Sequence, residues 1–487
     1  MEYPPAPGGG LCPRGSALGQ LLGHPCRIRT AGVREGDVLR MIPLQPAIQT
    51  ILDAAGDKQI TILLDGNIPV EQLAAARAAV SAWSQAALCL VVEPADEQLL
   101  AGIDAGGAEY LGDRDLAECD GFLIVGDAFS ANPRCSRAVL DGHKARAPIV
   151  VIDPGFGPAA KFATHTVQVA PGKELEALSQ LSASEGGKAL SACKRVGVLV
   201  AAEYGRTAAW RRIGYAASEL AKSLGGGIAP QTSGANALAA VRMAGEGKTV
   251  SLAGALAERD DAKVAIGCDV LGMLGLDDLT VLAAAAALPN RTTAAAGVVL
   301  PAAMPGEYGG TYLMDGQRPV EVAALLDPPA GVQTPGDLVV SLARAAGAAE
   351  QTPRTEVPAR LSGEAPPPAP AGEPPAAPAL LLGRQAAHFG CGTLTGHASW
   401  QADLQALPPL RISADDAREM QLPNLSVVTV SVNGASLKAR IRIAPELPPG
   451  AVVLPEGLPE ARALTPAKLD VENDAVLAEP QAVQVSQ

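Results

Sequence analysis

Short, unbroken apolar segments alternate with helix-forming segments from residue 59 onward, and this alternation constrains the fold more than any other feature. The runs QITILLDGN, ALCLVVEP, CDGFLIVGDAF and APIVVIDPGFG are rich in Val, Ile and Leu, and segments such as VEQLAAARAAVSAWSQAA lie between them. A second series runs from RVGVLVAAEYG to AGVVLPAAMPGEYGG. Apolar strands joined through helices pair in parallel inside a sheet that is covered on both faces. The sequence therefore predicts an α/β body of parallel sheets flanked by helices.

The domain organisation follows from changes of composition along the 487 residues, a length that favours more than one core. We expect an N-terminal junction segment (1–58), a first α/β domain (59–190), a second α/β domain (191–350), a Pro/Ala-rich linker (351–380), a small C-terminal β-barrel (381–470) and a flexible tail (471–487). The linker contains the run PPPAPAGEPPAAPA, which cannot build a core. The barrel is predicted from period-two alternation in LSVVTVSVNGASLKARIRI and from the hairpin signal Asn433-Gly434.

Charge and hydropathy exclude several classes of protein. The net charge of −13 argues against binding to nucleic acid, because no basic stripe is present to neutralise phosphates. No apolar run reaches the roughly 18 residues that a spanning helix needs, and the N-terminus lacks a signal-peptide pattern. We therefore expect a cytoplasmic protein without direct membrane insertion, which could associate with a membrane through a complex.

The eight cysteines have no C-x-x-C spacing, which argues against a disulfide framework or a local zinc or iron–sulfur site. His388 and His397 flank Cys391 in HFGCGTLTGH, but the spacing matches no zinc pattern, and we interpret these side chains as structural. A G-x-G-x-x-G motif after the first strand and a phosphate-binding P-loop are both absent. The sequence thus argues against a standard dinucleotide or ATP site.

Polar residues follow the predicted strands. Asp65, Asp127, Asp153 and Glu203 each come directly after an apolar run. Ligands of open parallel sheets bind beyond the carboxyl ends of strands, so these positions are consistent with a nucleotide-like cleft. The alternative, that they are ordinary turn residues, stays open. Glu307, in the glycine-rich segment MPGEYGGTYLMDGQR, fits either a ligand-wrapping loop or a surface loop.

Taken in order, several segments resemble the molybdopterin oxidoreductase superfamily, most closely the C-terminal part of the large iron–sulfur subunit of NADH–quinone oxidoreductase. The segments that carry the resemblance are CPRG, LGHPCRIRTAGVREGD, FLIVGDAFSANPRCSRAVLDGHKARAPIVVIDP, TAAAGVVLPAAMPGEYGGTYLMDGQRPVEV and LRISADDAREMQLPNLSVVTVSVNG. The last segment resembles the C-terminal barrel that caps the pterin in active members. The resemblance covers nearly the whole chain, and it is the order of the segments that makes it specific.

The resemblance implies a pterin-binding cleft and, in the family, a [4Fe–4S] cluster, so molybdopterin and [4Fe–4S] are the cofactors that it suggests. The residues that it assigns to the cleft, which need not be functional here, are Asp127, Asn132, Asp153, Glu174, Asn236 and Glu307. Cys12 matches the last of the four cluster cysteines, but the other three are missing upstream, so Cys12 is interpreted as an unoccupied remnant unless another chain supplies them. Glu174 and Gly297 each stand where the family has Asp, which further weakens a pterin site.

The resemblance therefore implies a structural subunit of a cytoplasmic electron-transfer complex of the NADH–quinone oxidoreductase type, with iron–sulfur subunits as partners and no metal or catalytic residue of its own. One alternative is an active molybdopterin or tungstopterin oxidoreductase of formate or formyl type, in which Cys135 would bind the metal. Another is a metal-free subunit of a formyltransferase/hydrolase complex. The sequence leaves all three open.

Overall fold

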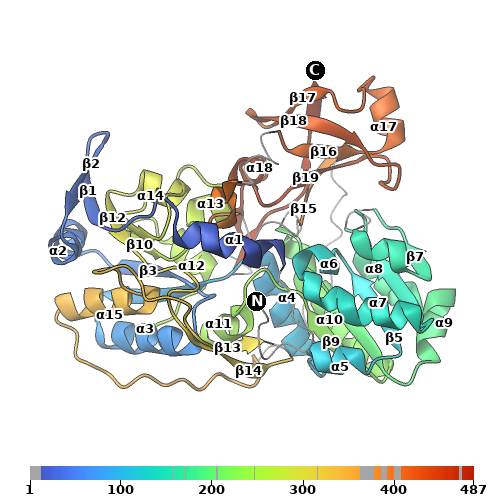
Figure 1. Ribbon diagram of the computed structural model, residues 1–487, viewed down its shortest axis with the longest axis horizontal. Helices are drawn as coiled ribbons and strands as arrows, with labels where there is room; N and C mark the ends of the chain where they lie inside the picture. Colours follow the sequence, from blue (N-terminus) through green and yellow to red (C-terminus); the bar gives the residue numbers. More distant parts are fainter. Residues whose placement is uncertain are drawn as a thin grey trace.

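Two α/β layers and a C-terminal barrel make up the computed structural model, which describes residues 12–155, 157–170, 172–204, 207–245, 247–314, 316–361, 378–384, 392–399, 407–470 and 474–486. Figure 1 shows the first layer at the left, the second at the right, and the barrel above them. The predicted architecture of parallel sheets flanked by helices, with a small β-barrel at the C-terminus, is confirmed. His388 and Cys391 lie outside the described residues.

The first sheet has seven strands in the order β2-β1-β12-β11-β10-β3-β4. Five strands pair in parallel: β12 (Val298–Pro301), β11 (Ala283–Ala286), β10 (Ala262–Ile266), β3 (Ile60–Asp65) and β4 (Ala86–Val91). A hairpin of β1 (Ala31–Glu35) and β2 (Val38–Ile42) extends the sheet in antiparallel fashion. The N-terminal junction segment thus contributes two strands to this sheet.

Helices cover both faces of the first sheet, as its continuously apolar strands require. The helices α2 (Leu44–Ala55), α3 (Val70–Ala82) and α15 (Pro335–Ala345) pack on one face. The helices α12 (Leu252–Ala257), α13 (Val270–Leu274) and α14 (Arg291–Ala295) pack on the other face. Neighbouring residues of β3 divide between the two cores, since Leu63 faces the second set of helices and Leu64 the first.

The second sheet has five parallel strands in the order β7-β6-β5-β8-β9. These strands are β7 (His165–Val167), β6 (Ile149–Ile152), β5 (Gly121–Val125), β8 (Val196–Val200) and β9 (Gly227–Pro230). The helices around this sheet are α5 (Asp113–Ala117), α6 (Ala128–Ala131), α7 (Ser136–Lys144), α8 (Glu174–Gln180), α9 (Glu185–Ser191) and α10 (Thr207–Ser223). Parallel pairing places the carboxyl ends of β5, β6 and β8 at the same edge of the sheet.

The chain crosses between the two sheets twice. It leaves the first sheet after β4 through α4 (Pro94–Gly106), and it returns through α11 (Ala237–Met243). The boundary expected at residue 190 therefore does not separate the sheets, since β3 and β4 belong to one and β5 to β7 to the other. That residues 59–190 and 191–350 form two separate folding units remains a prediction.

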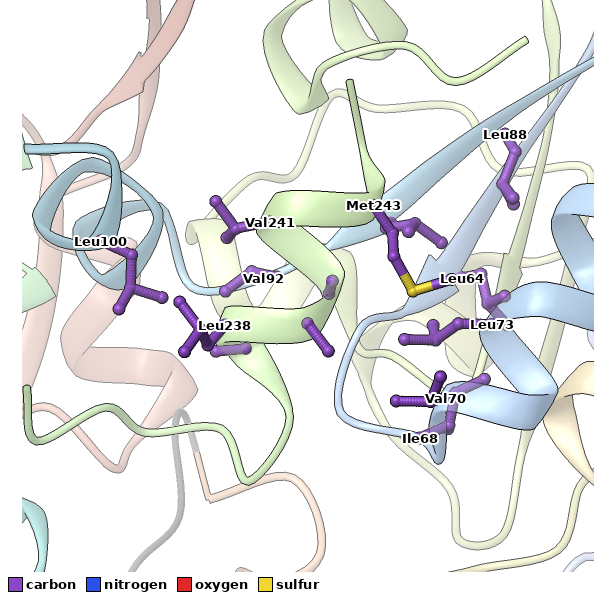
Figure 2. Packing of buried hydrophobic residues seen from close by; sticks show 14 of the residues in the cluster. Leu64, Ile68, Val70, Leu73, Leu88, Val92, Leu100, Leu238, Val241 and Met243 are labelled. Atoms are coloured by element: carbon purple, nitrogen blue, oxygen red, sulfur yellow. The ribbon is translucent and has the colours of Figure 1, made fainter. Parts of the chain in front are cut away.

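Packing at the crossing points joins the two layers into one core. Figure 2 shows α11 between them, with Leu238 near Leu100 of α4 and Met243 near Leu64 of β3. The helices α4 and α10 approach closely through glycine: a Cβ atom at Gly102 would lie 2.0 Å from the carbonyl oxygen of Arg211. A side chain at this position would therefore push the helices apart.

The barrel is formed by a seven-stranded mixed sheet in the order β22-β15-β19-β16-β18-β17-β23. Its main strands are β15 (Ala379–Gly383), β16 (Pro409–Ile412), β17 (Val427–Val432), β18 (Ala435–Ile443) and β19 (Ala451–Pro455), and its helices are α17 (Ala414–Glu419) and α18 (Pro459–Ala463). The predicted hairpin at Asn433-Gly434 joins β17 to β18, and both residues have positive φ, 48° and 90°. A tight two-residue hairpin turn requires this geometry.

The described residues of the expected flexible tail form short strands, and the flexibility of the tail remains a prediction. The strands β22 (Gln481–Ala482) and β23 (Gln484–Ser486) pair with β15 and β17, respectively. A further strand, β21 (Ala475–Leu477), pairs with β20 (Lys468–Asp470). The polar composition of this segment suits edge strands, whose backbone groups are satisfied by the barrel although few side chains are buried.

No helix within the described ranges is both long and apolar enough to cross a membrane.

Candidate functional site

An acidic cavity of about 80 Å³ lies between the second sheet and the barrel. Asp127 follows β5, Asp153 follows β6 and Glu203 follows β8, so each acid stands at the carboxyl end of a strand. Arg384 and Arg411 of the barrel also line the cavity, together with glycines and apolar residues. The structure thus brings together two of the six residues assigned to the cleft, Asp127 and Asp153.

Both of these aspartates also organise the backbone around them. The Asp127 carboxylate accepts a hydrogen bond from the Ser130 amide (3.0 Å) and caps α6. The Asp153 carboxylate accepts from the amides of Gly155 (2.9 Å) and Gly157 (2.5 Å). A Cβ atom at Gly157 would lie 2.6 Å from the Asp127 side chain, so only glycine fits between the two acids.

Burial shifts the protonation of this cluster. Burial, with a smaller contribution from Asp153, raises the pKa of Asp127 to about 6, even though its hydrogen bond to Ser130 opposes the shift. Burial and the neighbouring Asp153 and Asp127 carboxylates raise the pKa of Glu203 well above its ordinary value. These effects favour the protonated form of Glu203, although the nearby Arg384 opposes them.

Arg384 connects the barrel to both α/β layers. Its Nε donates to the carbonyl oxygen of Ala202 (2.6 Å), one Nη to the Ser233 hydroxyl (2.6 Å), and the other Nη to the Asp96 carboxylate (2.9 Å). The Ser233 amide also donates to Asp96 (2.6 Å). Each nitrogen of this buried guanidinium therefore already donates to an acceptor within the chain.

A second buried arginine, Arg462 of α18, fixes the barrel from the other side. It donates to Glu93 at the start of α4 (2.9 Å) and to the carbonyl oxygen of Met273 (2.8 Å). Its guanidinium lies 4.3 Å from the ring centroid of Tyr204, and the Tyr204 amide donates to Glu456 of the barrel (3.4 Å). Cation–π and ion-pair contacts thus reinforce the same interface.

Asn132 lies at a second, separate cavity of about 260 Å³. Its amide donates to the side-chain oxygen of Gln231 (3.0 Å). The arginines of this cavity are engaged as well. Arg14 of α1 (Pro13–Leu22) donates to backbone carbonyl oxygens of α6, and Arg134 pairs with Asp113.

Asn236 and Glu307 lie outside both cavities and connect segments of the backbone. Asn236 is fully buried, and it donates to the carbonyl oxygen of Ile68 (2.7 Å) and accepts from the amide of Leu313 (2.9 Å). Glu307 forms a buried ion pair with Arg27. These contacts are those of structural side chains, and the pterin role assigned to both residues remains a prediction.

Glu174 is the first residue of α8 and is fully buried. Cys12 precedes α1 and is partly buried. Cys135 is buried, and burial raises the pKa of its thiol well above the ordinary value, which disfavours the thiolate that a metal requires. Among the described residues, no three His, Cys, Asp or Glu side chains form a group that could hold a metal ion.

Sequence reasoning identified the acids of the cavity but missed the arginines that neutralise the barrel interface. Arg384 and Arg462 come from the barrel, and their partners Asp96 and Glu93 come from the start of α4. The available signal was an arginine placed directly after the apolar run ALLLG. Nothing in the sequence pairs it with an acid 288 positions earlier.

Comparison with known proteins supports the superfamily. Residues 379–475 match the family described as "Molydopterin dinucleotide binding domain". The structure of acetylene hydratase from Pelobacter acetylenicus is similar over 98% of this chain and 94% of that chain, with a TM-score of 0.66 and 11% identity. This chain has the molybdopterin oxidoreductase fold.

A further similar structure is the formyltransferase/hydrolase complex FhcABCD from Methylorubrum extorquens in complex with methylofuran. The similarity covers 65% of this chain and 98% of that chain, with a TM-score of 0.47 and 16% identity. A comparison with curated proteins gave no match.

The described residues do not fit a pterin dinucleotide. Small-molecule sites in proteins measure about 300–1,000 Å³, whereas the two cavities that contain residues assigned to the cleft measure about 80 and 260 Å³. The phosphate groups of a dinucleotide need cationic donors, but Arg384 already donates to three protein acceptors, on Ala202, Ser233 and Asp96. The smaller cavity also contains three carboxyl groups, and a phosphate placed beside them would make their ionisation still less favourable.

Proposed function

We propose that this chain is a non-catalytic subunit of a multi-subunit complex, in which a molybdopterin oxidoreductase fold serves as a scaffold. The observation that carries the proposal is the small acidic cavity, in which Arg384 is held by Asp96, Ser233 and Ala202. In place of a ligand, this ion-pair network bridges the barrel and the two layers. The fold then contributes surface and rigidity to its complex.

The test is metal and pterin analysis of the complex that co-purifies with the affinity-tagged full-length chain. We expect molybdenum and tungsten to be far below one atom per chain, and no fluorescent oxidised pterin after denaturation. A pterin-containing oxidoreductase purified in parallel controls for loss of cofactor during preparation. Stoichiometric molybdenum or tungsten bound to this chain would overturn the proposal and favour the active-enzyme alternative.

The kind of complex is the finer part of the proposal, and two kinds fit a metal-free subunit. The resemblance of the sequence to the large iron–sulfur subunit of NADH–quinone oxidoreductase suggests an electron-transfer complex of that type, with iron–sulfur partners. The other kind is a formyltransferase/hydrolase complex. Mass spectrometry of the co-purified chains separates them, because iron–sulfur subunits support the first, and hydrolase and transferase subunits support the second.

A further inference from the structure

The largest of the described cavities lies far from the acidic site, at the edge of the first sheet. It measures about 610 Å³, within the range of small-molecule sites. One wall is α3, a second is the segment 247–249 beside β4, and the outer wall is the extended segment 349–361, which we name the strap. Figure 1 shows the strap running from α15 below the first layer toward the second.

The wall formed by α3 leaves room for a ligand. Ala74, Arg77, Ala78 and Ser81 follow one another at helical spacing, so they share one face of the helix. Two of these four residues are alanines, which leave space beneath the strap. Interiors are normally packed without such voids. The cavity therefore has the form of a binding site with a small-residue floor.

The cavity is basic although the chain as a whole has a net charge of −13. Arg77 of α3, Lys248 and Arg354 of the strap line it from three separate segments, and Glu356 is the one acidic residue in its described lining. Lys248 donates to the carbonyl oxygen of Trp83 (2.7 Å), which holds its ammonium in place and leaves two further N–H donors. Converging cations of this kind favour a multiply charged anion.

The strap is held toward its end, where Val357 and Leu361 also pack against the main core. Arg360 donates to the carbonyl oxygen of Ala108 (2.9 Å), and the Leu361 amide donates to Asp104 (3.0 Å). Between residues 349 and 359, no backbone hydrogen bond to another described residue is formed. A segment without such bonds opens at low free-energy cost. The exposed part of the strap, residues 349–356, can therefore move to admit a ligand and then close over it.

We propose that this cavity binds an organic diphosphate of about nucleotide size. The phosphates would contact Lys248, Arg77 and Arg354, and the apolar part would lie on Ala74, Ala78 and Val357. The hydroxyl of Thr352 lines the same cavity, and those of Ser81 and Thr249, which already donate to backbone carbonyl oxygens, can accept a hydrogen bond there. The site lies at the amino end of β4, so it is independent of the acidic cavity and of the scaffold function.

Isothermal titration of the full-length chain with ADP, inorganic pyrophosphate and adenosine tests the proposal. We expect ADP to bind more tightly than pyrophosphate, and adenosine not to bind. Lys248→Met and Arg354→Met should each weaken ADP binding about tenfold, the loss expected for one charge-assisted hydrogen bond. Arg418→Met, which removes an exposed arginine of α17 on the barrel, is the matched control and should leave binding unchanged.

Hydrogen exchange of the strap provides a second readout. Saturating ADP should slow exchange of the amides between residues 349 and 359, and Ala74→Leu, which fills the cavity floor, should abolish both the binding and the protection. Circular dichroism checks that each variant folds. If neither ADP nor pyrophosphate binds below about 1 mM, or if Lys248→Met and Arg354→Met bind like Arg418→Met, the proposal is wrong.

Discussion

At the scale of single residues, buried charges at the barrel interface determine what the site can do. Arg384 is 8% exposed, and it contacts one acid directly and lies 3.6 Å from another, Glu456. Removing one partner of a buried ion pair leaves the other charge uncompensated, and this costs more than the pair itself contributes. Arg384 therefore connects the barrel to the two α/β layers, and three protein acceptors already hold its guanidinium.

We expect Arg384→Met to lower the free energy of unfolding by about 3–5 kcal/mol, because Asp96 and Glu456 lose their counter-charge. Urea denaturation followed by circular dichroism measures this. Arg411→Met is the matched control, since Arg411 lines the same cavity but is one-third exposed and pairs with Glu446 at the surface. Its cost should stay below about 1 kcal/mol. The double variant Arg384→Met/Asp96→Leu should recover part of the lost free energy of unfolding. Equal effects of Arg384→Met and Arg411→Met would contradict the role of Arg384 as the buried connection between the barrel and the layers.

At the scale of elements, the contact between α4 and α10 decides how the two layers are joined. Gly102 and Gly106 of α4 meet Gly214 and Ser218 of α10. A Cβ atom at Gly106 would lie 2.5 Å from the Ser218 Cβ, and one at Gly214 would lie 2.5 Å from the carbonyl oxygen of Leu99. The backbones approach closely because no side chain stands between them.

Gly102→Ala should therefore destabilise the protein by about 1–3 kcal/mol through overpacking, because its Cβ would meet the backbone of Arg211, which cannot move aside. The control is Gly19→Ala in the exposed middle of α1, where an added Cβ meets no atom within 4 Å. That change should instead stabilise by about 0.5–1 kcal/mol, since alanine favours the helix. Thermal unfolding of both variants measures the difference, and a neutral Gly102→Ala would show that the helices have room.

At the scale of the whole molecule, buried acids make the free energy of unfolding decrease as the pH rises. Burial raises the pKa of Asp65 to about 6, and it does the same for Asp127. A carboxyl whose pKa is higher in the folded than in the unfolded protein binds its proton more tightly when folded. The contribution of such a carboxyl group to the free energy of unfolding is favourable at low pH, and it is lost as the pH rises through about 6. Glu203 adds to the same trend.

We expect the free energy of unfolding to fall between pH 5 and pH 7.5. Asp127→Asn should flatten this slope and stabilise the protein at pH 7.5 by about 1–3 kcal/mol, given about 1.4 kcal/mol for each unit of pKa shift. Asp141→Asn provides the control, because Asp141 is exposed and its hydrogen bond with Lys144 lowers its pKa. Urea titrations across this pH range measure the slopes. A slope unchanged in Asp127→Asn would contradict the raised pKa.

The sequence by itself determined the local structure and the class of fold. Unbroken apolar runs become parallel strands such as β3 and β5 because they are buried on both faces, and Asn433-Gly434 forms the hairpin because its backbone adopts positive φ at low cost. Asp127 and Asp153 could be placed beside each other because parallel strands end at one edge. These properties depend on neighbours in the chain or on the regular geometry of a sheet.

Only the tertiary structure decided what the site contains and which surfaces meet. The pairing of Arg384 with Asp96, the crossing of α4 over α10 and the strap that encloses the basic cavity all join residues distant in sequence. Such contacts leave no periodic pattern and no local motif in the sequence, because they depend on how the folded layers pack against each other. The order of residues in the chain suggested a cleft role for Asn236 and Glu307, but it could not reveal their contacts. In the structure Asn236 contacts the backbone, and Glu307 pairs with Arg27.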